Sequence, residues 1–461
     1  MKLCVIGTGY VGLTTGACLA AVGHEVVCTD SDAGKIAGLR QGILPIFEER
    51  LAEVVAAARA AGTLHFDDNA NSALESSEAI FICVGTPPDA DGKANLAAVE
   101  AVARQIAAQA RGGRLVVGKS TVPVHTGEQI KRVLATYAGA NSHFEVASNP
   151  EFLREGTGVY DFFHPDRIVV GTDTPTAAAQ LQAIYGPVLE GRGQCGWHAQ
   201  SLQACGWRPP AWVATSIPSA ELIKHASNSF LSMKISYANA IADLCELAGA
   251  DAAEVLGGMG LDRRIGKDFL HPGLGFGGFC FPKDLSAFVE MAMDLGYDFR
   301  LLREVQAINA RRVEQFLRKV RDELWVLQGK TIGVLGLAFK AGTDDIRLSP
   351  AMAVVRELVR QGVRVRAFDP QARERARAEL GEAIEYCSTA EAVSEDADAV
   401  LILTEWPEFR AADWAAMSSR MRRALVLDGR NLFRAEELAR FGFRHRGIGL
   451  PAPVQDFAVS R

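Results

Sequence analysis

The sequence predicts an α/β fold with two nucleotide-binding βαβ domains. Three observations lead to this prediction. A strand at 3–6 runs into a glycine-rich turn and a helix, the same order of elements begins again at 331, and a long helical pattern at 219–249 lies between them. Strands that alternate with helices form parallel sheets, and a glycine turn between strand and helix is typical of nucleotide-binding folds.

The composition is that of a soluble globular protein with several domains. The chain has 461 residues, 48% of them hydrophobic and 23% charged, and no apolar run has the length of a membrane span. A net charge of −6 excludes a general attraction to nucleic acid or to anionic membranes. Nine scattered cysteines predict reduced thiols in the cytoplasm. Because no CxxC or HExxH pairing occurs, we predict no metal site.

The first element is a strand that ends in the GxGxxG turn Gly7, Gly9 and Gly12. These glycines permit a tight turn and bring a pyrophosphate close to the N-terminus of the next helix. A second strand, 25–29, ends at Asp30, at the distance where an acid binds the ribose hydroxyls. We therefore predict a dinucleotide site. Because Asp30 would repel a 2′-phosphate, NAD is favoured over NADP.

Three further strand ends carry polar residues. The apolar run 79–84 ends before Thr86, 115–117 leads to Thr121, and 144–147 leads to Glu151. Ligands of open parallel sheets bind beyond the carboxyl ends of the strands, so these ends should line one crevice. The alternative is that Thr121 and Glu151 only form turns and caps.

The segment 191–218 breaks the pattern with Gly, Pro and Trp, and we interpret it as an inserted loop. A disulfide or metal role is the alternative for Cys195 and Cys205, and the lack of further ligands beside them argues against it. We assign this segment no function.

A long helix should follow, with Ser219 as its N-cap and Gly249 at its end. About 30 residues would span roughly 45 Å, enough to pair with a copy from another subunit. Lys224 and Asn228 are four residues apart and lie on one face. They are either site residues or a solvated stripe.

The stretch 275–284 places Cys280 after a run of glycines and before Lys283 and Asp284. A thiol is a good nucleophile only as thiolate, which a nearby ammonium group favours. The alternative, a buried structural cysteine, is the more frequent role of an isolated cysteine beside aromatic residues. The predicted partners in the rest of the chain favour the nucleophile.

The last third repeats the first. A strand at 331–335 runs into Gly336, and a second strand, 363–368, ends at Asp369. The later glycines of the fingerprint are absent, and Lys340 stands in their region. A lysine there suits a nucleotide held by charge. Arg347 and Arg430 also follow strands.

Taken together, these motifs resemble the UDP-glucose/GDP-mannose dehydrogenase family over nearly the whole chain. The resemblance rests on ordered motifs at 7–12, 120–123, 149–156, 221–228, 275–284, 339–347 and 428–431. It implies two Rossmann-like doubly wound domains joined by a central helical domain with a long dimerisation helix. It places the NAD-binding domain at 1–200, the helical domain with the cysteine loop at 201–325, and the UDP-sugar-binding domain at 326–461.

The resemblance also implies oxidation of the C6 hydroxyl of a sugar nucleotide to a carboxylate, with two NAD and one water. Cys280 would trap the aldehyde as a thiohemiacetal, and the second oxidation would leave a thioester that water cleaves. Lys224 would stabilise the oxyanions, and Glu151 would act as general acid or base. Asp284, through a water held with Thr121, and Asn228 complete the predicted catalytic set. Which carboxylate acts at which step stays open.

The same match assigns binding residues. For NAD these are Gly7, Gly9, Tyr10, Val11, Gly12, Asp30, Lys35, Thr86, Thr121, Glu155, Lys283 and Arg347. For the sugar nucleotide they are Glu151, Phe152, Leu153, Arg154, Glu155, Lys224, Asn228, Arg264, Phe269, His271, Gly273, Gly275, Phe276, Gly277, Phe339, Lys340 and Arg430. Arg264 resembles an arginine contributed across a homodimer. Phe279 departs from the family, in which many members carry a small residue beside the cysteine.

UDP-glucose is the substrate that the resemblance favours, with UDP-glucuronate as product. Two alternatives stay open. A relative within the family would oxidise GDP-mannose or a UDP-N-acetylhexosamine. From another class, a non-catalytic NAD-sensing module would keep the fold, although the intact Cys280, Lys224 and Asp284 argue against it.

Overall fold

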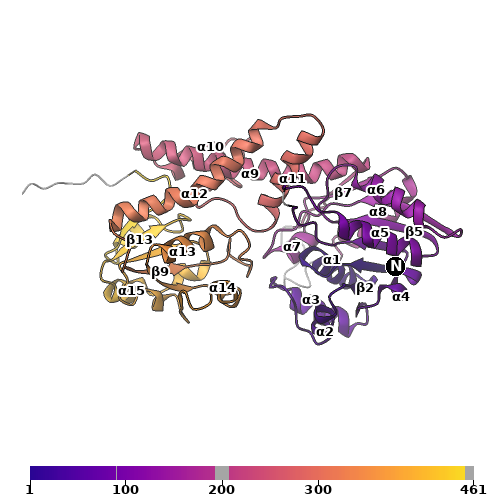
Figure 1. Ribbon diagram of the computed structural model, residues 1–461, viewed down its shortest axis with the longest axis horizontal. Helices are drawn as coiled ribbons and strands as arrows, with labels where there is room; N and C mark the ends of the chain where they lie inside the picture. The colour runs from indigo at the N-terminus through magenta and orange to yellow at the C-terminus, as the bar shows by residue number, and fades with distance from the viewer. Residues whose placement is uncertain (90, 193–206, 452–461) are drawn as a thin grey trace, which may run out of the picture. The chain divides into compact units, whose positions relative to one another are not determined.

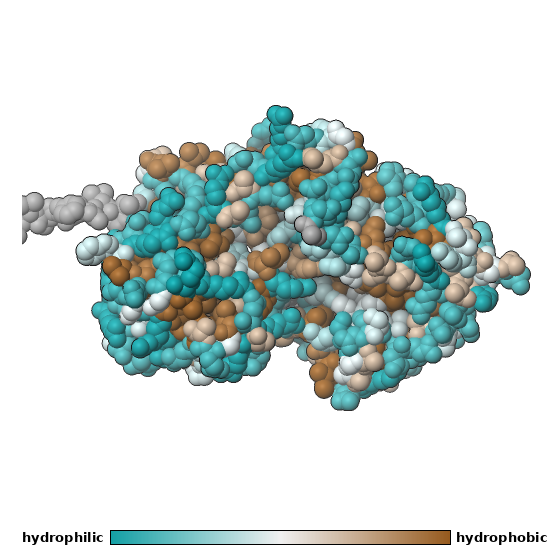
Figure 2. Space-filling model, in the orientation of Figure 1, coloured by the Kyte–Doolittle hydropathy of each residue, from teal (hydrophilic) through white to brown (hydrophobic). Residues whose placement is uncertain are grey.

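The computed structural model describes residues 1–89, 91–192 and 207–451. These residues form two compact units. The first consists of Met1–Ser227 and Ser286–Tyr297, and the second of Asn228–Leu285 and the described residues from Asp298 onward. Within these ranges, no helix has the length and apolar character that crossing a bilayer requires. Figure 2 shows a mainly hydrophilic face with scattered hydrophobic patches, as is usual for globular proteins.

The first unit contains a sheet of eight strands in the order β3-β2-β1-β4-β5-β6-β7-β8. Its strands are β1 Lys2–Ile6, β2 Glu25–Thr29, β3 Leu64–Asp67, β4 Ala79–Ile82, β5 Gly112–Gly118, β6 Ser142–Ser148, β7 Arg167–Thr172 and β8 Ala211–Thr215. The first six strands are parallel and have the Rossmann order 3-2-1-4-5-6. Strand β7 runs antiparallel to β6, and β8 is parallel to β7.

Alternate residues of β1 explain why helices cover both faces of this sheet. Leu3 and Val5 belong to one buried cluster, and Cys4 and Ile6 to another. Because successive side chains of a strand point to opposite faces, a strand that is apolar throughout needs cover on both. The helices are α1 Tyr10–Ala21, α2 Ala33–Arg40, α3 Leu51–Ala60, α4 Ala70–Ser76, α5 Ala97–Gln109, α6 Thr126–Tyr137, α7 Gly158–Phe163 and α8 Pro175–Leu189 (Figure 1).

The second unit contains a parallel sheet in the order β11-β10-β9-β12-β13-β14, which repeats the order of the first six strands. Its strands are β9 Thr331–Leu335, β10 Arg364–Phe368, β11 Glu385–Tyr386, β12 Ala399–Ile402, β13 Leu425–Asp428 and β14 Arg444–Arg446. Its helices are α13 Pro350–Arg360, α14 Arg373–Leu380, α15 Trp414–Arg420 and α16 Ala435–Ala439, with 3₁₀ turns η1 Glu391–Ser394 and η2 Pro407–Ala411. The predicted α/β class with two Rossmann-like domains is confirmed.

Helices form the part of the chain between the two sheets. They are α9 Ile217–Ala248, α10 Ala252–Gly260, α11 Cys280–Asp294 and α12 Arg300–Leu324. The predicted long helix is therefore present, and its 32 residues span roughly 48 Å. The predicted N-cap at Ser219 is wrong. The hydroxyl of Ser216 accepts the hydrogen bond from the N–H of Ser219, so the cap lies three residues earlier.

The interpretation of 191–218 as one inserted loop is also wrong in part. Ala211–Thr215 forms the edge strand β8, which pairs with β7 along its whole length. The tryptophan and the preceding prolines hid this strand, because proline usually ends a strand pattern. Cys195 and Cys205 lie outside the described residues.

Candidate active site

The glycine turn after β1 has the geometry that dinucleotide binding requires. Gly7 has a φ of 101°, and a Cβ there would lie 2.6 Å from the carbonyl oxygen of Cys83. A Cβ on Gly12 would lie 1.8 Å from the carbonyl oxygen of Gly7. Both positions therefore require glycine, because the turn packs directly on the backbone. Tyr10 and Val11 open α1, so the predicted residues lie at a helix N-terminus, which favours a phosphate group.

Asp30 follows the last residue of β2 and lies beside this turn. Its Oδ2 accepts hydrogen bonds from the N–H of Thr8 at 2.8 Å and from the hydroxyl of Thr8 at 2.9 Å. Lys35 Nζ lies 3.7 Å away. Burial favours the neutral acid, but the hydrogen bonds from Thr8 and Asp32, together with Lys35, outweigh it and lower the pKa of Asp30. The carboxylate is thus anionic at neutral pH and suited to accept hydrogen bonds from a ribose.

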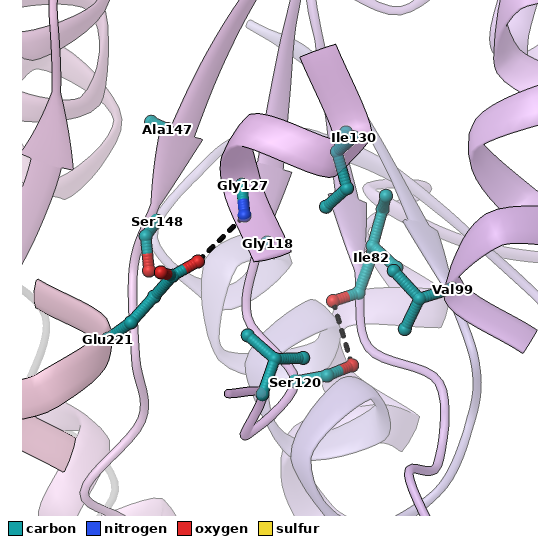
Figure 3. Close-up of a pocket in the computed structure, with 10 residues that line it drawn as sticks. Ile82, Val99, Gly118, Ser120, Gly127, Ile130, Ala147, Ser148 and Glu221 are labelled. Atoms are coloured by element: carbon teal, nitrogen blue, oxygen red, sulfur yellow. Dashed lines mark hydrogen bonds between the residues drawn. The ribbon is translucent and has the colours of Figure 1, made fainter. Parts of the chain in front are cut away.

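The ends of β4 and β5 meet, as predicted. The hydroxyl of Thr86 donates to the carbonyl of Thr121 at 2.8 Å, and the hydroxyl of Ser120 donates to the carbonyl of Val84 at 2.6 Å. Behind Ser120 lies a cavity of about 10 Å³, close to the space that one water needs. In Figure 3 Ser120 points toward Ile82 at this cavity.

Glu221 of α9 reaches the same cavity and caps α6. Its Oε1 accepts from the N–H of Gly127 at 2.7 Å, as Figure 3 shows. Its Oε2 accepts from the N–H of His125, also at 2.7 Å. His125 has a φ of 74°, so the entry to α6 is a tight, left-handed turn. Burial raises the pKa of Glu221 to about 7, against the opposing effect of the two N–H donors. Glu221 thus fixes the loop that carries Thr121.

Glu151 and Lys224, which the sequence separates by 73 positions, form a buried ion pair of 2.9 Å. Each side chain is 5% exposed. The Lys224 ammonium also lies 5.4 Å from the ring centre of Phe152. The guanidinium of Arg167, a residue of β7, lies 3.9 Å from the same ring centre. Little water reaches this ion pair, so its charges act strongly on a ligand.

The segment after Glu151 is held at both ends. The Glu151 carboxylate accepts from the N–H of Leu153 at 2.7 Å, and the hydroxyl of Tyr10 donates to the carbonyl of Arg154 at 2.7 Å. The Arg154 guanidinium is engaged by Asp161 at 2.6 Å. This segment is therefore held in place through its backbone groups. The side chain of Arg154 has a structural partner, Asp161, that the sequence did not reveal.

In the second unit, Cys280 is the first residue of α11 and is partly exposed. The N-terminus of a helix stabilises an anion, so this position favours the thiolate. Cys4 and Cys83 differ, because burial raises the pKa of each thiol to about 12 and leaves it unreactive. Cys280 is therefore better placed to act as a nucleophile than these buried thiols.

Asp284 lies one turn after Cys280 and joins two other predicted residues. Its Oδ2 accepts from the Asn228 amide at 2.7 Å, and its Oδ1 lies 2.7 Å from Lys283 Nζ. All three residues are buried. The structure thus brings Asn228 of α9 together with Lys283 and Asp284 of α11, the helix that Cys280 begins. Lys224 and Glu151 form their pair in the first unit.

The ring of Phe279 contacts two cationic side chains. The Arg347 guanidinium lies 4.5 Å from its ring centre and the Lys283 ammonium 5.6 Å from it. Asp345 holds Arg347 from the side at 2.7 Å, and the N–H of Gly278 donates to the carbonyl of Arg347 at 3.0 Å. The aromatic ring therefore orders two cations that the sequence assigned to the cofactor.

The glycine loop before Cys280 packs on its own aromatic residues. Phe269, which has a φ of 61°, and Phe276 lie 6.2 and 6.0 Å from the ring of Phe281. A Cβ on Gly277 would lie 2.4 Å from the carbonyl oxygen of Leu348. The remaining predicted residues of this loop are His271, Gly273 and Gly275, which lie between Phe269 and Phe276 in the sequence.

Arg430 connects the loops of the second sheet. It donates to the carbonyl of Leu403 at 2.9 Å and to the carbonyl of Phe339 at 2.8 Å. Lys340 Nζ lies 5.6 Å from the ring centre of Phe339. Thus Phe339, Lys340 and Arg430 form one basic cluster at the carboxyl ends of β9 and β13, where such sheets bind ligands.

Two predictions concern other parts of the chain. In the ranges that the structure describes, no group of three His, Cys, Asp or Glu side chains could hold a metal ion. Arg264 lies on the surface, with Asp262 Oδ2 at 2.6 Å. Its predicted role across a dimer stays a prediction.

Family models match the chain in three consecutive parts. The NAD binding domain of the UDP-glucose/GDP-mannose dehydrogenase family matches 1–189, its central domain 218–311 and its UDP binding domain 333–435. The chain belongs to this family. The first unit thus contains the family's NAD-binding domain, and the predicted NAD cofactor is supported.

Members of the UDP-glucose/GDP-mannose dehydrogenase family align over almost the entire chain. A UDP-glucose 6-dehydrogenase of Rhizobium meliloti is 44% identical over 98% of this chain and 100% of its own. The structure of a UDP-glucose dehydrogenase from Pyrobaculum islandicum has a TM-score of 0.87 at 38% identity and covers 98% of both chains. That of a UDP-D-ManNAc dehydrogenase from Pyrococcus horikoshii has a TM-score of 0.81 at 28% identity, covering 97% of this chain and 99% of the other.

Sequence reasoning missed the residues that hold the site from behind. Thr8 orients Asp30, and Glu221 caps α6. Glu48 accepts hydrogen bonds from the N–H groups of Gly156 and Gly158 at 2.7 and 2.6 Å. These partners are 94 to 110 positions apart for Glu221 and Glu48, so no local pattern could indicate them.

Proposed function

We propose that the protein is a UDP-glucose 6-dehydrogenase, which oxidises UDP-glucose to UDP-glucuronate with two NAD⁺ and one water. The placement of Cys280 carries the proposal: a partly exposed thiol at a helix N-terminus, one turn from Asp284. The family's NAD-binding and UDP-binding domain models support it, and so does the 44% identity with a UDP-glucose 6-dehydrogenase.

The proposed chemistry uses each buried group. NAD⁺, which the glycine turn after β1 and Asp30 would hold, would supply the hydride acceptor for both oxidations at C6. The Cys280 thiolate adds to the aldehyde carbon and forms a C–S bond, which keeps the intermediate on the protein as a thiohemiacetal. After the second hydride has left, water adds to the thioester carbonyl, the C–S bond breaks, and the thiol and a carboxylate remain.

Charge and protons are handled by the paired side chains. The Lys224 ammonium stabilises the alkoxide and the later oxyanions, because its buried position leaves its charge unscreened. Glu151, 2.9 Å from Lys224, can accept a proton from the attacking water. Asp284, oriented by Asn228, assists proton transfer through a water.

Two sets of residues would bind the ligands. Gly7, Gly9, Gly12, Asp30, Lys35 and the strand end at Thr86 are proposed for NAD, since they lie around the turn after β1. The basic cluster of Phe339, Lys340 and Arg430 is proposed for the nucleotide, whose diphosphate requires cations. The domain limits 1–200, 201–325 and 326–461 and a cytoplasmic location, in keeping with buried thiols such as Cys4 and Cys28, belong to the same proposal.

We also infer a homodimer. Phe230, Tyr237 and Leu244 recur at intervals of seven on α9 and are 57%, 51% and 60% exposed. Residues seven apart lie on the same helix face, and an exposed apolar stripe of this kind suits a second helix. The exposed Arg264 could then reach the neighbouring substrate. Sedimentation of the wild type and of Tyr237→Glu tests this: a dimer that the substitution splits supports it, and a wild-type monomer contradicts it.

The experiment that tests the function counts NADH per sugar nucleotide consumed. A value of about two supports the thioester route, since two hydrides leave C6. A value of about one indicates a simple alcohol dehydrogenase, and no NADH indicates an NAD-binding module without catalysis. Parallel reactions with GDP-mannose and a UDP-N-acetylhexosamine decide between the substrates, a comparison that the likeness to a UDP-D-ManNAc dehydrogenase makes necessary.

A further inference from the structure

The loop before Cys280 is held by side chains that the proposed chemistry does not use. Asn239 of α9 is fully buried, and its Oδ1 accepts from the N–H of Gly273 at 2.8 Å. Arg312 of α12 donates from Nε to the carbonyl oxygen of Gly273 at 3.1 Å. Both polar backbone groups of one residue are thus bound by side chains of two different helices.

A second attachment lies three residues further along the loop. Asn309 Oδ1 accepts from the N–H of Phe276 at 2.8 Å, and Asn309 Nδ2 donates to the carbonyl of Phe276 at 3.0 Å. The two bonds fix the orientation of the amide. A Cβ on Gly275 would lie 2.4 Å from Asn309 Oδ1, so the glycine allows this close approach. Asn309 and Arg312 are three apart on α12 and share a face.

Arg312 is a buried cation, and its guanidinium is held by hydrogen bonds on several sides. It is 2% exposed, and its charge is balanced by Asp243 at 2.6 Å, which also accepts from Gln315 at 3.0 Å. The side chain of Asp243 is 37% exposed, so only the guanidinium of this pair is taken out of water. The buried guanidinium also donates to the carbonyl oxygen of Gly273, and this bond ties the loop to α12.

The held loop lies against the proposed nucleotide site. A Cβ on Gly273 would lie 3.0 Å from the carbonyl oxygen of Gly429 and 3.7 Å from Cδ of Arg430. The other end of the loop is Gly278, two residues before Cys280. Its N–H donates to the carbonyl oxygen of Arg347. The backbone is therefore fixed at Gly273, Phe276 and Gly278 between the basic cluster and the thiol.

We propose that Asn239, Asn309 and Arg312 are positioning residues that preset the loop 273–278 for the sugar nucleotide and for Cys280. This proposal rests on the proposed function. A loop fixed before binding loses little conformational entropy when the ligand arrives, so the attachments should favour binding and the alignment of the thiol. They should have little effect on the NAD-binding turn, which the first unit builds by itself.

Asn309→Leu tests the proposal, because it removes both bonds to Phe276 at similar side-chain volume. We expect the KM for UDP-glucose to rise by about ten-fold and kcat to fall, with the KM for NAD within about two-fold of the wild type. Asn309→Asp keeps the acceptor for Phe276 and should recover part of the affinity. Arg312→Met should resemble Asn309→Leu, whereas Arg311→Met, at the exposed neighbouring arginine that pairs with Glu304, should behave as the wild type.

A purely structural role would lower the melting temperature and change the constants of both substrates together, and that result would overturn the proposal. So would an unchanged KM for UDP-glucose in Asn309→Leu. If the wild type forms no NADH with any sugar nucleotide, the proposed function fails instead. Hydrogen exchange then decides the present proposal: faster exchange of 273–280 in Asn309→Leu, without faster exchange of β9, supports it, and unchanged exchange refutes it.

Discussion

The two Rossmann-like domains each have an aspartate after their second strand, and the two aspartates have different roles. Asp30 directly follows β2 and accepts hydrogen bonds from Thr8 and from the N–H of Asp32. Asp369 directly follows the matching strand β10 and is 2% exposed. It accepts from four backbone N–H groups and from the indole of Trp406. The first acid keeps capacity for a ribose, and the second is used up by its own domain.

The turns beside the two acids differ in the same sense. Gly336 has a φ of 97°, close to the 101° of Gly7, so the turn itself is preserved. In the second domain the next N–H groups, those of Leu337 and Ala338, both donate to Asp369. Thr404 donates to the carbonyl of Ala338 at 2.6 Å. A fold that binds a dinucleotide in one copy has thus become a closed turn in the other, where Arg430 and Lys340 supply charge instead.

Replacing Asp369 should break the second domain. Asp369→Ala leaves five donors without their acceptor, so we expect a loss of about 3 kcal/mol or more in the free energy of unfolding. Denaturant unfolding measures it. Asp369→Asn retains one carbonyl acceptor and should lose less. A stable Asp369→Ala protein with altered substrate affinity would show that this acid contacts the ligand. That result would contradict the conclusion that Asp369 serves only its own domain.

Replacing Asp30 should affect the cofactor rather than the fold. We expect Asp30→Ala to raise the KM for NAD by about ten-fold and to weaken discrimination against NADP, because the ribose loses an acceptor and a 2′-phosphate loses a repelling charge. The free energy of unfolding should change by about 1 kcal/mol. Steady-state kinetics with both cofactors measures the effect, and an unchanged cofactor preference would remove Asp30 from the site.

Glu221 gives the first domain a pH dependence of its own. Its pKa is raised from 4.5 to about 7 by burial, so the folded protein holds the proton more tightly than the unfolded chain. The resulting stabilisation is complete below pH 4.5 and disappears as the pH rises through 7. The wild type should therefore lose roughly 1 to 3 kcal/mol relative to Glu221→Gln between pH 5 and 8. If the free energies of unfolding of the two proteins changed with pH in parallel, the raised pKa of Glu221 would be refuted.

Phe279 should have the smallest effect. Phe279→Ser removes the ring over which Arg347 lies at 4.5 Å, so we expect the KM for NAD to rise by about three-fold, the typical loss for a cation–π contact. Phe279→Tyr keeps the ring and should restore the wild-type value. An equal change in both variants would mean that the ring does not order Arg347.

The sequence predicted the parts of the molecule that depend on local pattern. The GxGxxG turn, the apolar strands such as 331–335 and the helix to Ala248 follow from periodicity and glycine positions alone. The supports of the site could not be predicted in this way. Asn309 lies 33 positions from Phe276 and Glu221 lies 94 from Gly127, and an amide or carboxylate on a helix gives no sign of the distant backbone group that it will bind.

Mass analysis of Cys280 during turnover tests the central claim most directly. Wild-type protein mixed with UDP-glucose and NAD⁺ and quenched in acid within one turnover should carry the UDP-glucuronoyl group on the peptide that contains Cys280, because the thioester is stable in acid. Cys280→Ser should carry no adduct on that peptide and should form UDP-glucuronate at less than about one thousandth of the wild-type rate. A normal yield from Cys280→Ser, or an adduct on another residue, would contradict the account.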